Sequence, residues 1–89
     1  MTYNFDVHEK CLRELEKASS KNPVLAEAAR KKMKEILEKP HHYKPLLHEL
    51  AGEYRVHIMN CFVLKFMVDE AAQTVHFTFF GHHDQAYKR

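Results

Sequence analysis

The 89-residue chain has no tryptophan, only two glycines, three prolines and two cysteines. So little glycine and proline excludes a collagen-like or low-complexity chain, and two cysteines cannot build the disulfide framework of a small secreted domain. No apolar run approaches the ~20 residues that a membrane-spanning helix needs. Residues 1–7 lack a basic stretch followed by an apolar one. We therefore expect no export signal, no contact with a membrane, and a cytoplasmic protein with reduced thiols.

Charge and histidine are distributed unevenly along the chain. The formal net charge is +2, which is too small to indicate nucleic-acid binding by itself. Residues 1–39 hold nine of the fourteen Lys and Arg, whereas residues 40–89 hold seven of the eight histidines. Because histidine changes its charge near neutral pH, the second half contains the candidates for acid-base chemistry.

The first half has the pattern of one short strand and two helices. Residues 1–7 alternate weakly between apolar and polar, which predicts a strand. Over residues 8–19 the apolar positions recur at intervals of three and four, which predicts a helix that the polar residues 19–22 end. Asn22 can accept a hydrogen bond from a free amide of a second helix, and Pro23 suits its first position. That helix should end by Lys39, because Pro40 disfavours helical geometry in the residue before it.

After Gly52 the apolar period changes to two, which predicts three consecutive strands with turns at 59–61 and 69–73. In the last strand we expect Phe77 and Phe79 to face the helices and Phe80 to face away from them. The predicted fold is α+β, in the order strand, helix, helix, three strands. A helical hairpin packs on one face of a small, mostly antiparallel sheet, and residues 1–89 form a single domain.

The uncovered face of this sheet carries the residues that could do chemistry. Arg55 and His57 are two apart on one strand and point the same way, Lys65 lies on the next strand, and His82 or His83 follows the last strand. Cleavage of RNA requires a base for a 2′-hydroxyl, a fixed positive group near the phosphate and an acid for the departing oxygen. The alternative is a polar sheet face with ordinary surface histidines.

The histidines and Cys61 also suggest two other kinds of chemistry, for which the sequence gives less support. The pairs His41-His42 and His82-His83 suggest metal binding, but adjacent side chains on an extended chain point apart, and no HxxxH, HxH or cysteine pair occurs. We therefore expect no metal and no cofactor. Cys61 could act as a nucleophile beside His57, although a lone cysteine next to an apolar run is more often a small buried residue.

Four short segments in this order resemble the RelE/ParE superfamily of toxins from type II toxin-antitoxin modules, most closely its YafQ-like branch, which uses histidines. The segments are HELAG at 48–52, EYRVHI at 53–58, FVLKF at 62–66 and GHHDQAY at 81–87. The resemblance covers essentially the whole chain and implies a two-layer RelE-like fold. It also implies an mRNA interferase, a ribosome-dependent endoribonuclease that inhibits translation through metal-independent attack by a nucleotide's own 2′-hydroxyl.

The resemblance also implies roles for individual residues. The positions that match the catalytic set are His48, His57, His83 and Tyr87. His83 would be the general acid or phosphate stabiliser, His57 and His48 would share the base and orienting roles, and Tyr87 would stack on or orient the nucleotide. The basic residues expected to contact RNA are Arg55, Lys65, Lys44, Lys88 and Arg89.

The implied partners are a cognate antitoxin that wraps the toxin and mRNA in the ribosomal A site, with no direct DNA binding except through the antitoxin. One departure matters, because many relatives carry a strand arginine where this chain has Val63; Lys65 faces the same way and can supply the charge. Three alternatives stay open. They are a ParE-like gyrase poison that needs no catalytic histidine, an inactive RNA- or antitoxin-binding module, and a histidine-rich metal-binding domain.

Overall fold

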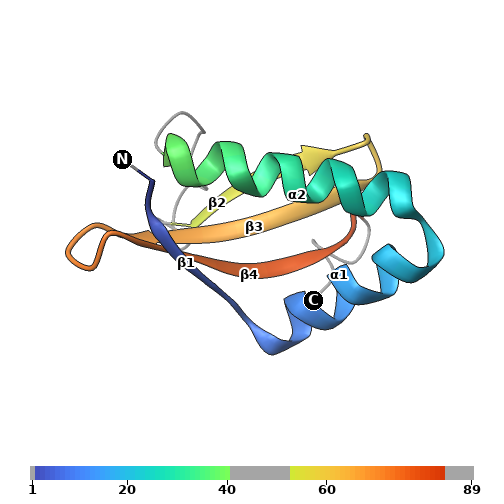
Figure 1. Cartoon of the computed structure of the whole chain (residues 1–89), viewed down its shortest axis with the longest axis horizontal. Helices are drawn as coiled ribbons and strands as arrows, with labels where there is room; N and C mark the ends of the chain where they lie inside the picture. Colours follow the sequence, from blue (N-terminus) through green and yellow to red (C-terminus); the bar gives the residue numbers. More distant parts are fainter. Residues whose placement is uncertain (1, 41–52, 84–89) are drawn as a thin grey trace.

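Two helices lie on one face of a four-stranded sheet (Figure 1). The computed structural model describes residues 2–40 and 53–83. Their elements, in chain order, are β1 (Asn4–Val7), α1 (Glu9–Lys21), α2 (Pro23–Glu38), β2 (Glu53–Ile58), β3 (Phe62–Asp69) and β4 (Thr74–His82). This order and the two-layer α+β architecture confirm the fold class expected from the sequence.

The sheet has the strand order β1-β4-β3-β2. The hairpin-linked strands β2, β3 and β4 pair antiparallel, whereas β1 pairs parallel to β4, with Phe5 opposite Val75. The helical hairpin makes this parallel pairing possible, because parallel strands need a long crossover connection between them and cannot be joined by a tight turn. Among the described residues, no helix is long and apolar enough to cross a membrane.

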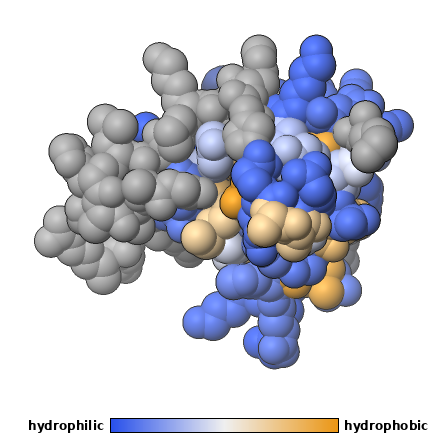
Figure 2. Space-filling model, turned by 90° about the vertical axis from the view of Figure 1, so that its left-hand side faces the viewer, coloured by the Kyte–Doolittle hydropathy of each residue, from blue (hydrophilic) through white to orange (hydrophobic). Residues whose placement is uncertain are grey.

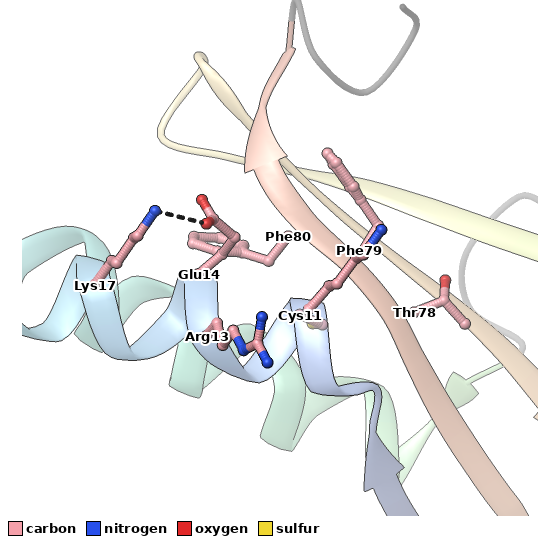
Figure 3. Close-up of a pocket in the computed structure, with 8 residues that line it drawn as sticks. Cys11, Arg13, Glu14, Lys17, Thr78, Phe79 and Phe80 are labelled. Carbon is pink, nitrogen blue, oxygen red and sulfur yellow. Dashed lines mark ion pairs between the residues drawn. The ribbon is translucent and has the colours of Figure 1, made fainter. Parts of the chain in front are cut away.

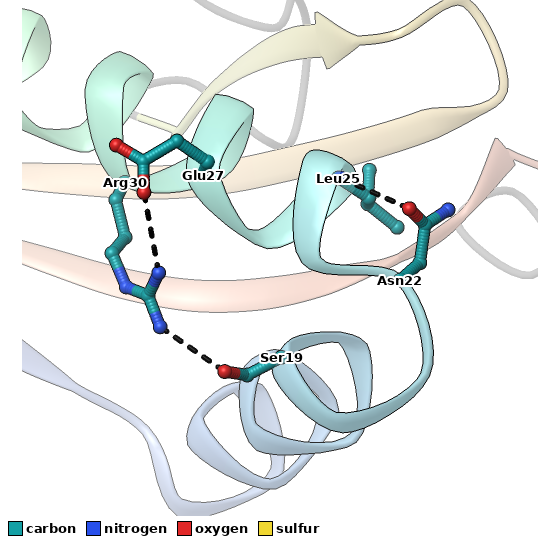
Figure 4. Close-up of polar contacts among 5 residues, drawn as sticks. All are labelled: Ser19, Asn22, Leu25, Glu27 and Arg30. Atoms are coloured by element: carbon teal, nitrogen blue, oxygen red, sulfur yellow. Dashed lines mark hydrogen bonds and ion pairs between the residues drawn. The ribbon is translucent and has the colours of Figure 1, made fainter.

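A single residue separates the two helices. The predicted break at 19–22 was wrong in extent, because α1 continues to Lys21 and only Asn22 intervenes. The Asn22 side chain accepts a hydrogen bond from the Leu25 backbone N–H at 3.2 Å, as expected for a helix N-cap (Figure 4). Arg30 of α2 reaches back to the Ser19 hydroxyl of α1 and also pairs with Glu27 (Figure 4). These exposed contacts add little stability, so the packed helix faces hold the hairpin together.

The core lies between the helices and the sheet. Its buried side chains are Cys11, Ala18, Leu25, Ala26, Ala29, Ile36, Val56, Ile58, Leu64, Phe66, Val75, Phe77 and Phe80. Phe80 belongs to this set and Phe79 does not, so the expected orientation of these two rings was wrong. The reason is a shift in the β3–β4 register: Phe66 is opposite Phe77 but Lys65 is opposite Phe79, which leaves Thr78 as an extra residue. Such a β-bulge reverses the faces of the residues that follow it.

The β2–β3 turn fixes the position of Cys61. Met59 and Asn60 adopt left-handed backbone conformations, with φ of 53° and 67°, as tight hairpin turns require. Cys61 follows them and is exposed, so the expectation that it is a small buried residue was wrong; the buried thiol is Cys11.

The end of the molecule from which the β3–β4 turn projects is mostly hydrophilic, with separate small hydrophobic patches (Figures 1 and 2).

Candidate functional site

The candidate site lies on the face of the sheet that points away from α1 and α2, which we call the distal face. Strand register places its side chains in two cross-strand rows. Arg55, Lys65 and Phe79 form the first row, and His57, Val63 and Gly81 form the second. The rows are two residues apart along each strand, which corresponds to roughly 6.6–6.8 Å. The distal face therefore places the two basic side chains, Arg55 and Lys65, in the row next to that of His57.

Two of the predicted catalytic histidines come together at this face. The ring centroids of His57 and His83 lie 5.5 Å apart with the planes inclined by 26°. The His83 backbone N–H donates a hydrogen bond to the Cys61 carbonyl oxygen at 2.6 Å, which holds the end of β4 against the β2–β3 turn. The site thus joins residues 26 positions apart in the sequence through backbone pairing across β3.

The neighbouring histidine points elsewhere. His82 is opposite Phe62 in the strand register, and its ring meets the Phe62 ring edge-on with centroids 5.6 Å apart. Consecutive side chains on an extended chain alternate between the faces of a sheet, so only one of His82 and His83 can join His57. In the structure the ring beside His57 is that of His83, and a catalytic role for it stays a prediction.

Four of the nine predicted site residues fall within the described part of the chain, and all four lie at the distal face. They are His57, His83, Arg55 and Lys65. The other five fall outside the described residues, and their placement stays a prediction: His48, Tyr87, Lys44, Lys88 and Arg89.

Val63 occupies the centre of the second row. Its side chain is fully buried, yet it is not part of the core between helices and sheet. In the family that the sequence resembles, many members have an arginine at this position. Here the position is apolar and excluded from water, and it lies opposite His57. Positive charge on this face comes instead from Arg55 and Lys65, which face each other across β2 and β3.

Phe79 is the residue at this face that the sequence pattern missed. Alternation through β4 assigned it to the core, whereas the bulge at Thr78 turns it to the distal face. A signal was present in the sequence, because Phe79 and Phe80 are adjacent and a regular strand can send only one of them inward. The Lys65 ammonium nitrogen lies 5.4 Å from the centroid of the Phe79 ring.

A groove of about 390 Å³ separates α1 from the edge of β4 (Figure 3). Its lining comprises Lys10, Cys11, Arg13, Glu14, Lys17, Thr78, Phe79 and Phe80. Phe80 points toward α1 and Phe79 away from it, which makes the effect of the bulge visible (Figure 3). Burial raises the pKa of the Cys11 thiol to about 11, so this thiol is protonated and unreactive at neutral pH.

Other polar groups on the sheet are engaged in structure. His76 Nδ1 lies 2.8 Å from the Asp6 carboxylate and ties β1 to β4. Within residues 2–40 and 53–83, no three histidine, cysteine or acidic side chains converge as metal ligands would.

Known proteins are similar to this chain in sequence and in fold. No family model matches the chain. It is 44% identical over 87 residues to a protein of Methanocaldococcus jannaschii named "Putative toxin RelE4", an alignment that covers 98% of this chain and 93% of the relative. The toxin-antitoxin complex RelBE2 of Mycobacterium tuberculosis contains a chain with a TM-score of 0.78 at 22% identity, over 93% of this chain and 100% of that one. The intact E. coli RelBE toxin-antitoxin complex gives 0.77 at 24% identity, over 89% and 94%.

Proposed function

The chain belongs to the RelE/ParE superfamily of toxins from type II toxin-antitoxin modules, and we propose that it is an mRNA interferase that cleaves mRNA in the ribosomal A site. The observation that carries this proposal is the pair of imidazoles from His57 and His83, with ring centroids 5.5 Å apart on a face that also holds Arg55 and Lys65. A gyrase poison requires no such pair. An acid and a base within reach of one ribose and its phosphate are what RNA cleavage by internal attack requires.

The proposed reaction transfers a proton at each end of one displacement. One of His57 and His48 accepts the proton of the 2′-hydroxyl while the other orients the ribose, and the 2′-oxygen then attacks the adjacent phosphorus. The bond from phosphorus to the 5′-oxygen breaks as the new bond forms, which leaves a 2′,3′-cyclic phosphate. His83 gives a proton to the departing 5′-oxygen, and Tyr87 orients the nucleotide.

Charge stabilisation falls to the basic residues of the distal face. Negative charge grows on the phosphate oxygens in the transition state, and fixed positive groups there lower the barrier. Lys65 takes the place of the arginine that many relatives carry at Val63, because it lies on the same strand and face. Lys44, Lys88 and Arg89 would extend this phosphate contact along the RNA.

The test is cleavage of mRNA on programmed ribosomes, followed by primer extension. We expect His57→Ala and His83→Ala each to slow cleavage by about 10²–10⁴-fold, the usual contribution of a general acid or base. His8→Gln is the matched control, because His8 is exposed at the start of α1, far along the chain from the pair. Circular dichroism must show that all three variants are folded. Full activity in both alanine variants would falsify the acid-base assignment.

A parallel assay separates this function from its main alternatives. Expression of the wild type should stop translation and growth, and DNA supercoiling by gyrase in its presence should be unchanged. Inhibition of gyrase without cleavage of mRNA would identify a gyrase poison instead. RNA binding without either effect would identify an inactive binding module, which the loss of the arginine at Val63 would then explain. The ribosomal target implies that the protein acts in the cytoplasm.

We also propose a cognate antitoxin as partner, as in the RelBE complexes that share the fold. The groove between α1 and β4 is a suitable contact surface, because Lys10, Arg13 and Lys17 outnumber Glu14, the partner of Lys17, around an apolar floor that includes Phe80. An acidic, partly apolar segment would complement it. Co-purification with the product of a neighbouring gene tests the partnership. Replacing Lys10 and Lys17 by Glu should weaken that complex. An unchanged affinity would show that the antitoxin binds a different surface.

A further inference from the structure

The β-bulge in β4 gives the distal face an aromatic side chain beside the histidine pair. Because Thr78 is the extra residue, Phe77 and Phe80 enter the core while Phe79 lies opposite Lys65 on the other face. Without the bulge, Phe79 would be buried and the row that contains Arg55 and Lys65 would have no aromatic member. The register irregularity therefore determines the chemistry of this row.

The Phe79 ring lies flat on the backbone of Gly81. A Cβ built on Gly81 would stand 2.9 Å from the Phe79 Cζ, 3.2 Å from Cε2 and 3.3 Å from Cε1. A point in the ring plane beyond Cζ would be distinctly farther from both Cε atoms, so these similar distances place Gly81 against the face of the ring. The ring thus extends along β4 from the basic row toward the row of His57. Gly81 acts as a positioning residue, because any larger side chain would occupy the place of the ring.

A cation accompanies the ring. The Lys65 ammonium nitrogen is 5.4 Å from the Phe79 centroid, and Arg55 is the cross-strand neighbour of Lys65. The ammonium lies over the ring, so the flexible Lys65 side chain has to move from the ring to a phosphate when a base stacks. An aromatic ring supported by backbone, with a mobile cation next to it, is the combination that single-stranded RNA recognition uses: the ring stacks on a base and the cation meets a phosphate. Phe79 as a whole is half-buried, so part of the residue is accessible.

We propose that Phe79 is a stacking platform for a nucleobase next to the scissile phosphate, and that Lys65 contacts the phosphate of the same nucleotide. This inference rests on the proposed function, since it assigns the site that holds the RNA while His57 and His83 act on it. Stacking on an aromatic face does not depend on base identity, so the platform would supply affinity and position rather than sequence preference.

The test uses a fluorescein-labelled hexanucleotide of 2′-O-methyl RNA, which lacks the attacking hydroxyl and cannot be cleaved. A set of otherwise identical oligonucleotides carries one abasic position each. We expect wild-type protein to bind the complete oligonucleotide about tenfold or more tightly than at least one abasic version, measured by fluorescence anisotropy at constant salt. Phe79→Leu should bind the complete oligonucleotide about tenfold more weakly and lose the difference, whereas Phe79→Tyr should retain it.

Phe5→Leu is the matched control, because Phe5 is an exposed phenylalanine of β1 that lines a different groove beside Leu12 and Met33. Its affinity should equal that of the wild type. Melting curves of each variant identify any loss of fold. Equal binding by wild type and Phe79→Leu, equal weakening by the Leu and Tyr variants, or no dependence of wild-type binding on any base would overturn the platform.

The two proposals fail in different ways. If Phe79→Leu cleaves mRNA as fast as the wild type, with the same half-saturating substrate concentration, the platform is rejected and the nuclease proposal stands. Base-dependent binding that Phe79→Leu abolishes, in a protein that cleaves no mRNA, supports the platform and rejects the nuclease.

Discussion

Replacing Gly81 by alanine should change stability in a direction that depends on the residue at position 79. The added Cβ would stand 2.9 Å from the Phe79 Cζ, whereas carbon atoms at optimal separation are about 3.5–4.0 Å apart. The ring must therefore shift by roughly 0.5–1 Å, and overpacking of this kind costs about 1–3 kcal/mol. Alanine is itself favoured over glycine inside a strand by about 0.5–1 kcal/mol. The net expectation for Gly81→Ala is a loss of up to about 2.5 kcal/mol.

The same change should stabilise a protein that lacks the ring. In a Phe79→Ala background the added methyl group no longer meets the ring, and the favourable term of about 0.5–1 kcal/mol should dominate. The double-mutant cycle should give a coupling energy of about 1–3 kcal/mol between the two positions. Gly81 does not adopt a left-handed backbone conformation, as expected for a residue inside β4.

Urea unfolding followed by circular dichroism, with all four proteins fitted to a common m-value, measures each free energy of unfolding. In a thermal scan each kcal/mol corresponds to about 4–8 °C for a domain of this size. A Gly81→Ala change of the same sign and size in both backgrounds would refute the close contact of ring and backbone. It would also remove the physical reason for the position of Phe79.

Other changes test the helices, the core and the thiols. Asn22→Ala should lower the free energy of unfolding by about 1 kcal/mol in the same urea assay, because it removes the cap on the Leu25 amide. Ile36→Ala, at a fully buried position of α2, should lower it by about 2–5 kcal/mol, and a smaller loss would indicate that the core closes around the cavity. Iodoacetamide at pH 8 should label Cys61 in the native protein and Cys11 only after unfolding, as mass spectrometry can establish. The raised pKa of Cys11 means that the unfolded state loses this proton first, so stability should fall between pH 9 and about 11 more steeply than in Cys11→Ala.

The sequence alone determined the kind and order of the elements. Period-two alternation in β2 and β3 correctly assigned Arg55, His57 and Lys65 to one face, because side-chain direction on a regular strand depends only on position. The start of α2 at Pro23 was also correct, since the amide that Asn22 caps lies three residues along the chain. Local interactions decide such features, and local interactions can be read from neighbouring residues.

Only the tertiary structure decided which distant residues meet. His57 and His83 come together because β3 pairs with both of their strands and the His83 amide bonds to Cys61, and no local rule specifies that register. The bulge at Thr78 arises because β4 must fit both Phe77 and Phe80 into the core against β3, and this requirement turns Phe79 outward against the expected alternation. The parallel place of β1 likewise depends on how the helices cross the sheet. Pairing between strands far apart in sequence is a property of the whole chain, which is why it placed these rings and the local pattern could not.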